Sequence, residues 1–165
     1  MKYWLTTHWP PIPQDKVQYP LRVWIEDGKE SVGRSLATGD RVLVYETKYG
    51  PPRRVTGVSG SARKVASIPG RQGIVSATIA TGALAKDASF EKFIYDDGSQ
   101  RWWCWHAPLQ ATLTKGLVPR MEVNRVLGYK PGYVFRGFGA RGSGLKEITK
   151  TQYSELVELY ELSTA

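Results

Sequence analysis

The sequence predicts an α+β fold in which β-strands dominate and one amphipathic helix closes the chain. Two observations carry this prediction. Short runs of β-branched and aromatic residues recur between turn-forming residues, and only the last part of the chain has apolar residues at helical spacing. The chain has 165 residues, 41% of them hydrophobic, which is enough for one domain with its own core. We therefore expect residues 1–165 to form a single domain.

The first half of the chain contains three predicted strands. Residues 3–7, 21–25 and 41–45 are runs rich in aromatic and β-branched residues, the types that favour extended backbone. Residues 31–36, between the second and third runs, predict a helical turn. Gly39-Asp40 then favours a turn that leads directly into the third strand.

Three further strands are predicted in the second half. Residues 73–80 form an apolar, β-branched run, and residues 90–95 and 101–107 form two others. Asp96-Asp97-Gly98-Ser99 joins the last two runs and has the residue types of a hairpin turn. The sequence therefore predicts a hairpin here.

The end of the chain predicts a helix over 150–162. Thr149 and Gln152 have the spacing of a capping box, in which each side chain bonds the backbone of the other residue. Apolar residues follow at intervals of three and four: Tyr153, Leu156, Val157 and Tyr160. We expect this stripe to pack on the core.

The segment from about 50 to 72 differs from the rest of the chain. It has no acidic residue, many Gly, Ser and Pro, and the basic residues Arg53, Arg54, Arg63, Lys64 and Arg71. We expect a mobile basic loop inserted into the domain. Two interpretations remain open: the charges bind phosphates of a nucleic acid, or the loop is a solvated insertion with no partner.

Charge and tryptophan content make nucleic acid the first partner to consider. The formal net charge is +8 and the pI is near 9.6, which favours an anionic partner. Three of the six tryptophans lie within residues 101–105. Indole faces in a positive field suit an unstacked nucleobase, although the same residues also pack in cores. Strand alternation places Trp103 and Trp105 on one face, and Trp102 and Cys104 on the other.

The sequence signals no catalytic or metal centre. Cys104, His8 and His106 do not have the spacing of a zinc site or of a Cys/His nucleophile. We expect a protein that is not an enzyme and has no metal or cofactor, and a hydrolase using His8, Glu46 or His106 is the alternative. No apolar run is long enough to span a membrane, and residues 1–5 lack the apolar region of a signal peptide. The expected location is cytoplasmic, without membrane binding.

A glycine-rich segment, residues 136–142, contains the pattern Gly-x-Gly-x-x-Gly. In dinucleotide-binding proteins this pattern opens a helix that leads to a second strand and an acidic ribose ligand. Too few residues follow Gly142 for that arrangement. We expect a flexible loop in which Arg136 and Arg141 either contact phosphate or stay solvated.

The order of short motifs along the chain resembles the EVE family, a branch of the PUA-like superfamily that is related to the YTH readers of methylated adenine. The resemblance covers nearly the whole chain. The motifs that carry it are Tyr3-Trp4-Leu5 with Pro10, Val23-Trp24-Ile25, Gly39-Asp40 with the strand to Tyr45, Gly73-Ile74-Val75, Arg101-Trp102, and Leu145-Lys146-Glu147-Ile148 with the helix after Thr149.

This resemblance implies a PUA-like β-pseudobarrel, flanked by short helices, with an aromatic pocket for a modified base at one end. It implies that Trp24 is an aromatic wall of the pocket and that Thr7 and His8 contact the base edge. The family has Lys, Ser and an acidic residue where this chain has Thr7, His8 and Trp9, and a histidine where it has Glu46. The full set of expected base contacts is Trp24, Thr7, His8, Tyr45, Trp102 and Trp103.

The resulting hypothesis is a non-catalytic reader of a methylated or hydroxymethylated base that is flipped into the pocket. The residues expected at the nucleic-acid backbone are Arg53, Arg54, Arg63, Lys64, Arg71, Arg136 and Arg141. By analogy, such a domain is the specificity module of a modification-dependent restriction system, and an effector nuclease in another chain or domain supplies cleavage. The alternative is a module that binds modified or structured RNA such as tRNA.

Overall fold

The structure is a computed structural model that describes residues 1–10, 22–48, 54–57, 62–64, 69–95, 98–135 and 144–164. The strands of these ranges are β1 (Tyr3–His8), β2 (Arg22–Ile25), β3 (Arg41–Glu46), β4 (Arg54–Gly57), β5 (Ala62–Lys64), β6 (Gly73–Ala80), β7 (Ala85–Lys86), β8 (Phe93–Tyr95), β9 (Gln100–Arg101), β10 (Trp105–Leu113), β11 (Val118–Pro119) and β12 (Leu145–Ile148). The helices are the short 3-10 helix η1 (Gly33–Ser35), α1 (Arg120–Leu127) and α2 (Lys150–Leu162).

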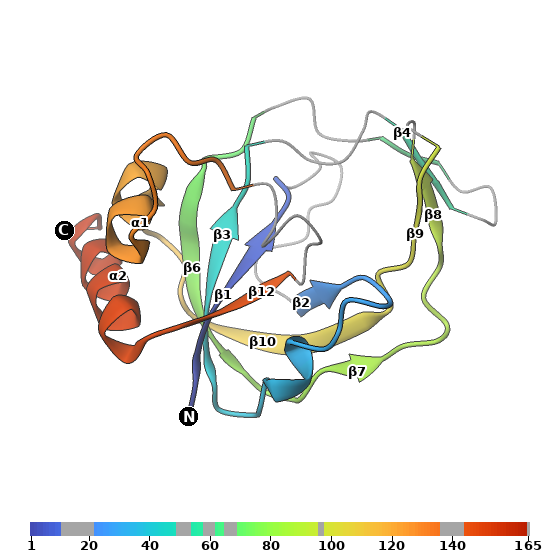
Figure 1. Ribbon diagram of the computed structural model, residues 1–165, viewed down its shortest axis with the longest axis horizontal. Helices are drawn as coiled ribbons and strands as arrows, with labels where there is room; N and C mark the ends of the chain where they lie inside the picture. Colours follow the sequence, from blue (N-terminus) through green and yellow to red (C-terminus); the bar gives the residue numbers. More distant parts are fainter. Residues whose placement is uncertain are drawn as a thin grey trace.

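Eight strands form one curled, mixed sheet in the order β12-β1-β3-β6-β10-β2, with β11 beside β6 and β7 beside β10. β1 and β3 run parallel, and the other neighbours are antiparallel. The sheet is a half-barrel, and α1 and α2 lie together beyond β6 at the left of Figure 1. The α+β class expected from the sequence is confirmed.

The longest strand, β10, connects the two parts of the curled sheet. Its first half, residues 105–108, pairs with β2, and Leu109 and later residues pair with β6. The register shifts between Ala111 and Leu113, which marks an irregularity in that ladder. One strand therefore links the central β6 to the edge strand β2.

A second, smaller sheet has the antiparallel order β5-β4-β8-β9 and lies at the right of Figure 1. Its β8–β9 pairing confirms the expected hairpin, with Phe93 opposite Arg101. Its β4 and β5 correct the expectation of a loop over about 50–72, because residues 54–57 and 62–64 are extended and pair with each other. Backbone pairing organises the described residues 54–57 and 62–64 of this basic segment.

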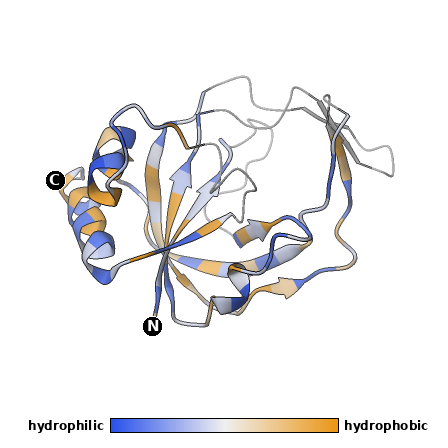
Figure 2. Ribbon diagram, viewed as in Figure 1, coloured by the Kyte–Doolittle hydropathy of each residue, from blue (hydrophilic) through white to orange (hydrophobic). Residues whose placement is uncertain are grey.

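The core lies on both faces of the central strands, because successive side chains of a strand point in opposite directions. On β3, Leu43 and Tyr45 join the cluster beneath the helices, whereas Val42 and Val44 join the cluster inside the curl. Figure 2 shows hydrophobic residues along these strands and mixed colouring around both helices. Burial on both faces explains why residues 41–45 are almost entirely apolar.

The C-terminal helix forms as predicted. Thr149 accepts a hydrogen bond from the Gln152 backbone at 3.0 Å, and the Gln152 side chain accepts one from Thr149 at 2.9 Å. Leu156 and Tyr160 are buried in the cluster beneath the helices, and Tyr153 and Val157 pack against it. Neither α-helix in the described ranges has the length and apolarity needed to cross a bilayer.

The chain between β8 and β10 differs from the expected geometry. Residues 101–107 do not form one strand: β9 ends at Arg101, β10 begins at Trp105, and residues 102–104 belong to neither strand. Likewise β8 starts at Phe93, three residues later than expected. Alternation therefore does not decide the directions of Trp102 and Trp103.

Candidate nucleic-acid interface

Trp24 is half-buried in a group of aromatic rings at the edge of the curled sheet. It pairs in register with His106 across β2 and β10, and the two ring centroids are 4.1 Å apart. The Phe90 ring lies 5.3 Å from Trp24 and 5.0 Å from His106. Trp24 thus has two ring neighbours and still reaches solvent.

The His106 imidazole is held by a hydrogen bond at each nitrogen. Its Nε2 lies 2.6 Å from the carbonyl oxygen of Trp103, which only accepts, so Nε2 carries the hydrogen. Its Nδ1 then accepts from Arg22 Nη1 at 3.4 Å. Burial lowers the pKa of His106, and the nearby guanidinium of Arg22 acts in the same direction. The ring beside Trp24 is therefore neutral at neutral pH.

His8, at the end of β1, is linked to the same group through Arg22. Its Nε2 donates to the carbonyl oxygen of Arg22 at 2.8 Å. Burial lowers the pKa of His8 from 6.5 to about 4, although this hydrogen bond and the charge of Glu46 oppose the shift. Arg22 thus connects both histidines of the chain, one through its backbone and one through its guanidinium.

Trp102 and Trp103 border the Trp24 group from the segment between β9 and β10. Trp102 donates from Nε1 to the carbonyl oxygen of Phe90 at 2.6 Å. Trp103 meets the Trp9 ring edge-on, with centroids 5.4 Å apart. The structure therefore brings four expected base contacts into one region, namely Trp24, His8, Trp102 and Trp103.

The indole nitrogen of Trp24 differs from those of the other tryptophans whose bonds are defined. Trp4 donates from its Nε1 to the Asp40 carboxylate, and Trp102 donates to the carbonyl oxygen of Phe90. Trp105 donates to the Asp27 carboxylate. Within the described ranges, Trp24 Nε1 has no hydrogen-bond acceptor. A half-buried donor without a protein partner is available to an acceptor on a bound molecule.

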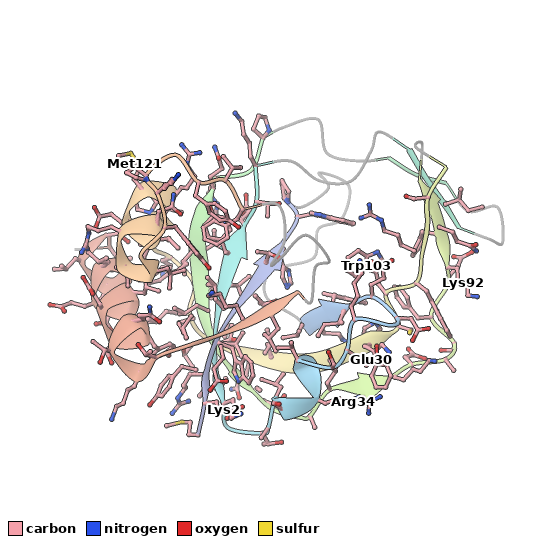
Figure 3. All side chains as sticks on the ribbon, viewed as in Figure 1. Lys2, Glu30, Arg34, Lys92, Trp103 and Met121 are labelled. Atoms are coloured by element: carbon pink, nitrogen blue, oxygen red, sulfur yellow. The ribbon has the colours of Figure 1, made fainter. Side chains whose placement is uncertain are left out.

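Cations border the same region. The ammonium groups of Lys86 and Lys92 lie 4.7 and 5.0 Å from the Trp102 ring centroid. The Arg34 guanidinium lies 5.1 Å from the Trp105 ring. In Figure 3, Trp103, Lys92 and Arg34 lie on the side of the molecule away from α1.

Thr7 and Tyr45 lie apart from this region. Tyr45 is 1% exposed and packs on Phe135 at a centroid distance of 4.4 Å, beneath the helices. Burial raises the pKa of Tyr45 to about 12. Thr7 pairs in register with Tyr45, and strand alternation places it on the opposite face from His8. The two strand-end residues expected at one base edge therefore face different ways.

The expected backbone contacts are only partly within the description. Arg53, Arg136 and Arg141 lie outside the described residues, and Arg54, Arg63 and Lys64 are placed as backbone positions of β4 and β5. Arg71 donates to Glu46 from Nε at 3.2 Å and from Nη2 at 3.1 Å. The Glu46 side chain is 4% exposed, so Arg71 neutralises a buried carboxylate.

Sequence reasoning missed four residues that belong to no short motif and approach the tryptophan rings only through the fold: Phe90, Lys86, Lys92 and Arg34. In the described part of the chain, no group of three or more His, Cys, Asp or Glu side chains is placed to hold a metal ion.

No model of a known protein family matches the sequence, and no curated protein matches it either.

Proposed function

We propose that this protein is a non-catalytic nucleic-acid-binding domain that takes one modified base against Trp24. The observation that carries the proposal is the setting of Trp24: a half-buried indole, flanked by Phe90 and His106, whose N–H has no acceptor in the described chain. The indole face offers a surface on which a base can stack, and the in-plane N–H is a separate donor for an acceptor elsewhere on the nucleotide, such as a sugar or phosphate oxygen. A methylated or hydroxymethylated base is the proposed ligand.

The neighbouring side chains support a flat, uncharged ligand. His106 is neutral and fixed by two hydrogen bonds, so it adds an orienting ring without adding charge. Lys86 and Lys92 supply positive charge one ring further away, beside Trp102. Aromatic rings for a base next to cations for the phosphates are the combination that single-stranded nucleic-acid sites use.

We extend the proposal to the fold type. The half-barrel, the strand Leu145–Ile148 and the final helix occur where the resemblance to the EVE family expects them. These agreements support a PUA-like β-pseudobarrel. By analogy with that family, we propose that the domain is the specificity module of a restriction system, in which an effector nuclease acts after modified DNA has been bound.

Fluorescence anisotropy tests the base-reading proposal. The probes are matched DNA and RNA oligonucleotides carrying one methylated, one hydroxymethylated or one unmodified base. We expect the wild type to bind a modified DNA more tightly than its unmodified match. Trp24→Ala removes a stacking contact of about 1–3 kcal/mol, which lowers the affinity by up to about a hundredfold, and is expected to abolish the preference for the modified base. Trp24→Phe keeps a ring, removes the N–H donor, and is expected to retain an intermediate preference.

Tyr133→Ala is the matched control, because Tyr133 is 39% exposed and belongs to the chain after α1. It removes an aromatic ring without touching the Trp24 group. Equal wild-type affinity for modified and unmodified oligonucleotides contradicts the reader proposal. A preference confined to the RNA probes replaces DNA with RNA as the partner. Thermal melting of each variant separates loss of binding from loss of folding.

A further inference from the structure

Two indoles and three cations form a continuous row beside the Trp24 group, which we call the cation–indole row: Arg34, Trp105, Lys86, Trp102 and Lys92. The Lys86 ammonium lies 5.9 Å from the Trp105 ring centroid and 4.7 Å from the Trp102 ring centroid, so it is close to both rings. Arg34 and Lys92 extend the row on either side, at 5.1 Å from Trp105 and 5.0 Å from Trp102. The members come from η1, β7, β10 and the segments preceding β8 and β10.

Hydrogen bonds at the ring edges fix both indoles of the row. Trp102 donates to the Phe90 carbonyl oxygen at 2.6 Å, and Trp105 donates to Asp27 Oδ1 at 3.1 Å. Cations near such fixed rings are held by the negative potential of the ring faces. Lys86 and Lys92 are thereby ordered before a ligand arrives, which reduces the entropy that ligand binding must remove.

The charge along the row is not uniform. Arg34 pairs with Glu30 at 3.6 Å, and Lys86 pairs with Asp27 at 3.5 Å. In the ranges that the structure describes, no carboxylate lies within salt-bridge distance of Lys92. Among the described residues of the row, the positive charge without a carboxylate partner is therefore that of Lys92, at the Trp102 end, where the Lys86 ammonium also approaches the ring.

This end of the row is next to Trp24. Phe90 connects them, because its ring lies 5.3 Å from the Trp24 ring and its carbonyl oxygen binds the Trp102 indole. We expect a strand whose base stacks on Trp24 to place an adjoining phosphate at this end of the row. We propose that Lys86 and Lys92 bind one backbone phosphate beside the base held at Trp24. This inference rests on the proposed function and assigns its phosphate contact to described residues.

The test compares Lys86→Met/Lys92→Met with the control Lys115→Met/Lys150→Met. Both double variants remove two positive charges and keep an apolar stem, and the control lysines are exposed on the chain after β10 and at the start of α2. Affinity for single-stranded DNA with one central 5-methylcytosine is measured against salt concentration. We expect the slope of log K against log salt to become smaller by about 0.7 for the Lys86/Lys92 variant only. The same loss is expected for unmodified DNA.

A second probe locates the phosphate. Replacing one of the two phosphates that adjoin the 5-methylcytosine by an uncharged methylphosphonate is expected to weaken wild-type binding. The same replacement is expected to leave the affinity of Lys86→Met/Lys92→Met unchanged, because its phosphate contact is already lost. Equal weakening of the wild type and this variant at both phosphate positions overturns the assignment.

The outcomes separate this inference from the reader proposal. A wild-type salt slope in Lys86→Met/Lys92→Met, with preference for 5-methylcytosine intact, overturns the phosphate site and leaves base reading standing. A smaller slope without any preference for modified bases upholds the phosphate contact and overturns base reading. Absence of binding to every DNA and RNA probe overturns both. Thermal melting confirms that each double variant is folded.

Discussion

Trp24 and His106 face each other across the β2–β10 pair, with ring centroids 4.1 Å apart and ring planes inclined by 64°. The orientation of the imidazole is set by Arg22 at one nitrogen and by the Trp103 carbonyl at the other. Trp24 therefore packs beside an imidazole with a fixed orientation and no charge at neutral pH. The following predictions test this arrangement and the charges around it.

His106→Phe keeps a ring beside Trp24 and removes both hydrogen bonds of the imidazole. We expect the free energy of unfolding to fall by about 1–3 kcal/mol, because the Trp103 carbonyl oxygen loses its donor in a partly buried setting. Urea denaturation measures the change. His106→Gln, which retains an N–H donor, is expected to recover part of the loss. Identical stability of all three proteins contradicts a structural role for the bond.

The histidines predict a loss of stability in mild acid. Their folded-state pKa values lie below 6.5, to about 4 for His8, so only the unfolded chain takes up their protons as pH falls from 6.5. The free energy of unfolding has its full value above about pH 6.5 and falls below that pH by at most about 1.4 kcal/mol per pH unit for each histidine, down to about pH 4 for His8. Urea titrations at several pH values measure the decline, and His8→Gln is expected to make it shallower. A wild-type curve that is flat over this range contradicts the prediction.

Asp27→Asn is expected to strengthen nucleic-acid binding. The Asp27 carboxylate pairs with Lys86 at 3.5 Å and accepts from Trp105 Nε1 at 3.1 Å. That hydrogen bond is the main reason that the pKa of Asp27 is lowered, so the carboxylate is ionised at neutral pH. Asparagine still accepts from Trp105 but no longer neutralises Lys86. Anisotropy titrations are expected to show tighter binding and a steeper salt slope, and weaker binding counts against the role given to Lys86.

Arg71→Met is expected to affect folding more than binding. Removing the guanidinium leaves the buried Glu46 carboxylate without its charged partner. The cost is below the about 3–5 kcal/mol of a fully buried pair, because half of the Arg71 side chain is exposed to water. Urea denaturation is expected to show the loss, while the salt slope of DNA binding stays near that of the wild type. If the variant keeps wild-type stability and shows a smaller salt slope, Arg71 contacts the nucleic-acid backbone instead.

Local sequence signals predicted much of the fold. Apolar runs located β1, β2, β3 and β6, and the Thr149–Gln152 capping box located the start of α2. In these segments, side-chain pattern and backbone preference agree, so neighbouring residues are sufficient information. The sequence analysis missed helix α1, although Gly128, which follows Leu127, has the left-handed conformation of a helix C-cap; the helix packs against α2 and β11.

The candidate site was less predictable, because it is assembled by tertiary contacts. Trp24 was expected in the site. Phe90 and Lys92 were expected only as part of a strand over residues 90–95, with no functional role. Tyr45 shows the opposite case: an aromatic residue at a strand end faces the helices and packs on Phe135. Elements that are distant in the sequence decide which face of a sheet is covered, so a short sequence pattern cannot predict it.

Because β10 pairs with both β2 and β6, the strand that carries His106 continues into the centre of the sheet. His106 pairs with β2 and Leu109 pairs with β6 on the same continuous strand, so we expect the two halves of β10 to open as one cooperative unit. Amide protons of residues 105–107 should consequently exchange with deuterated solvent at rates close to those of the β6 interior. A ligand that engages this edge would slow exchange deep in the molecule, at positions that it never touches.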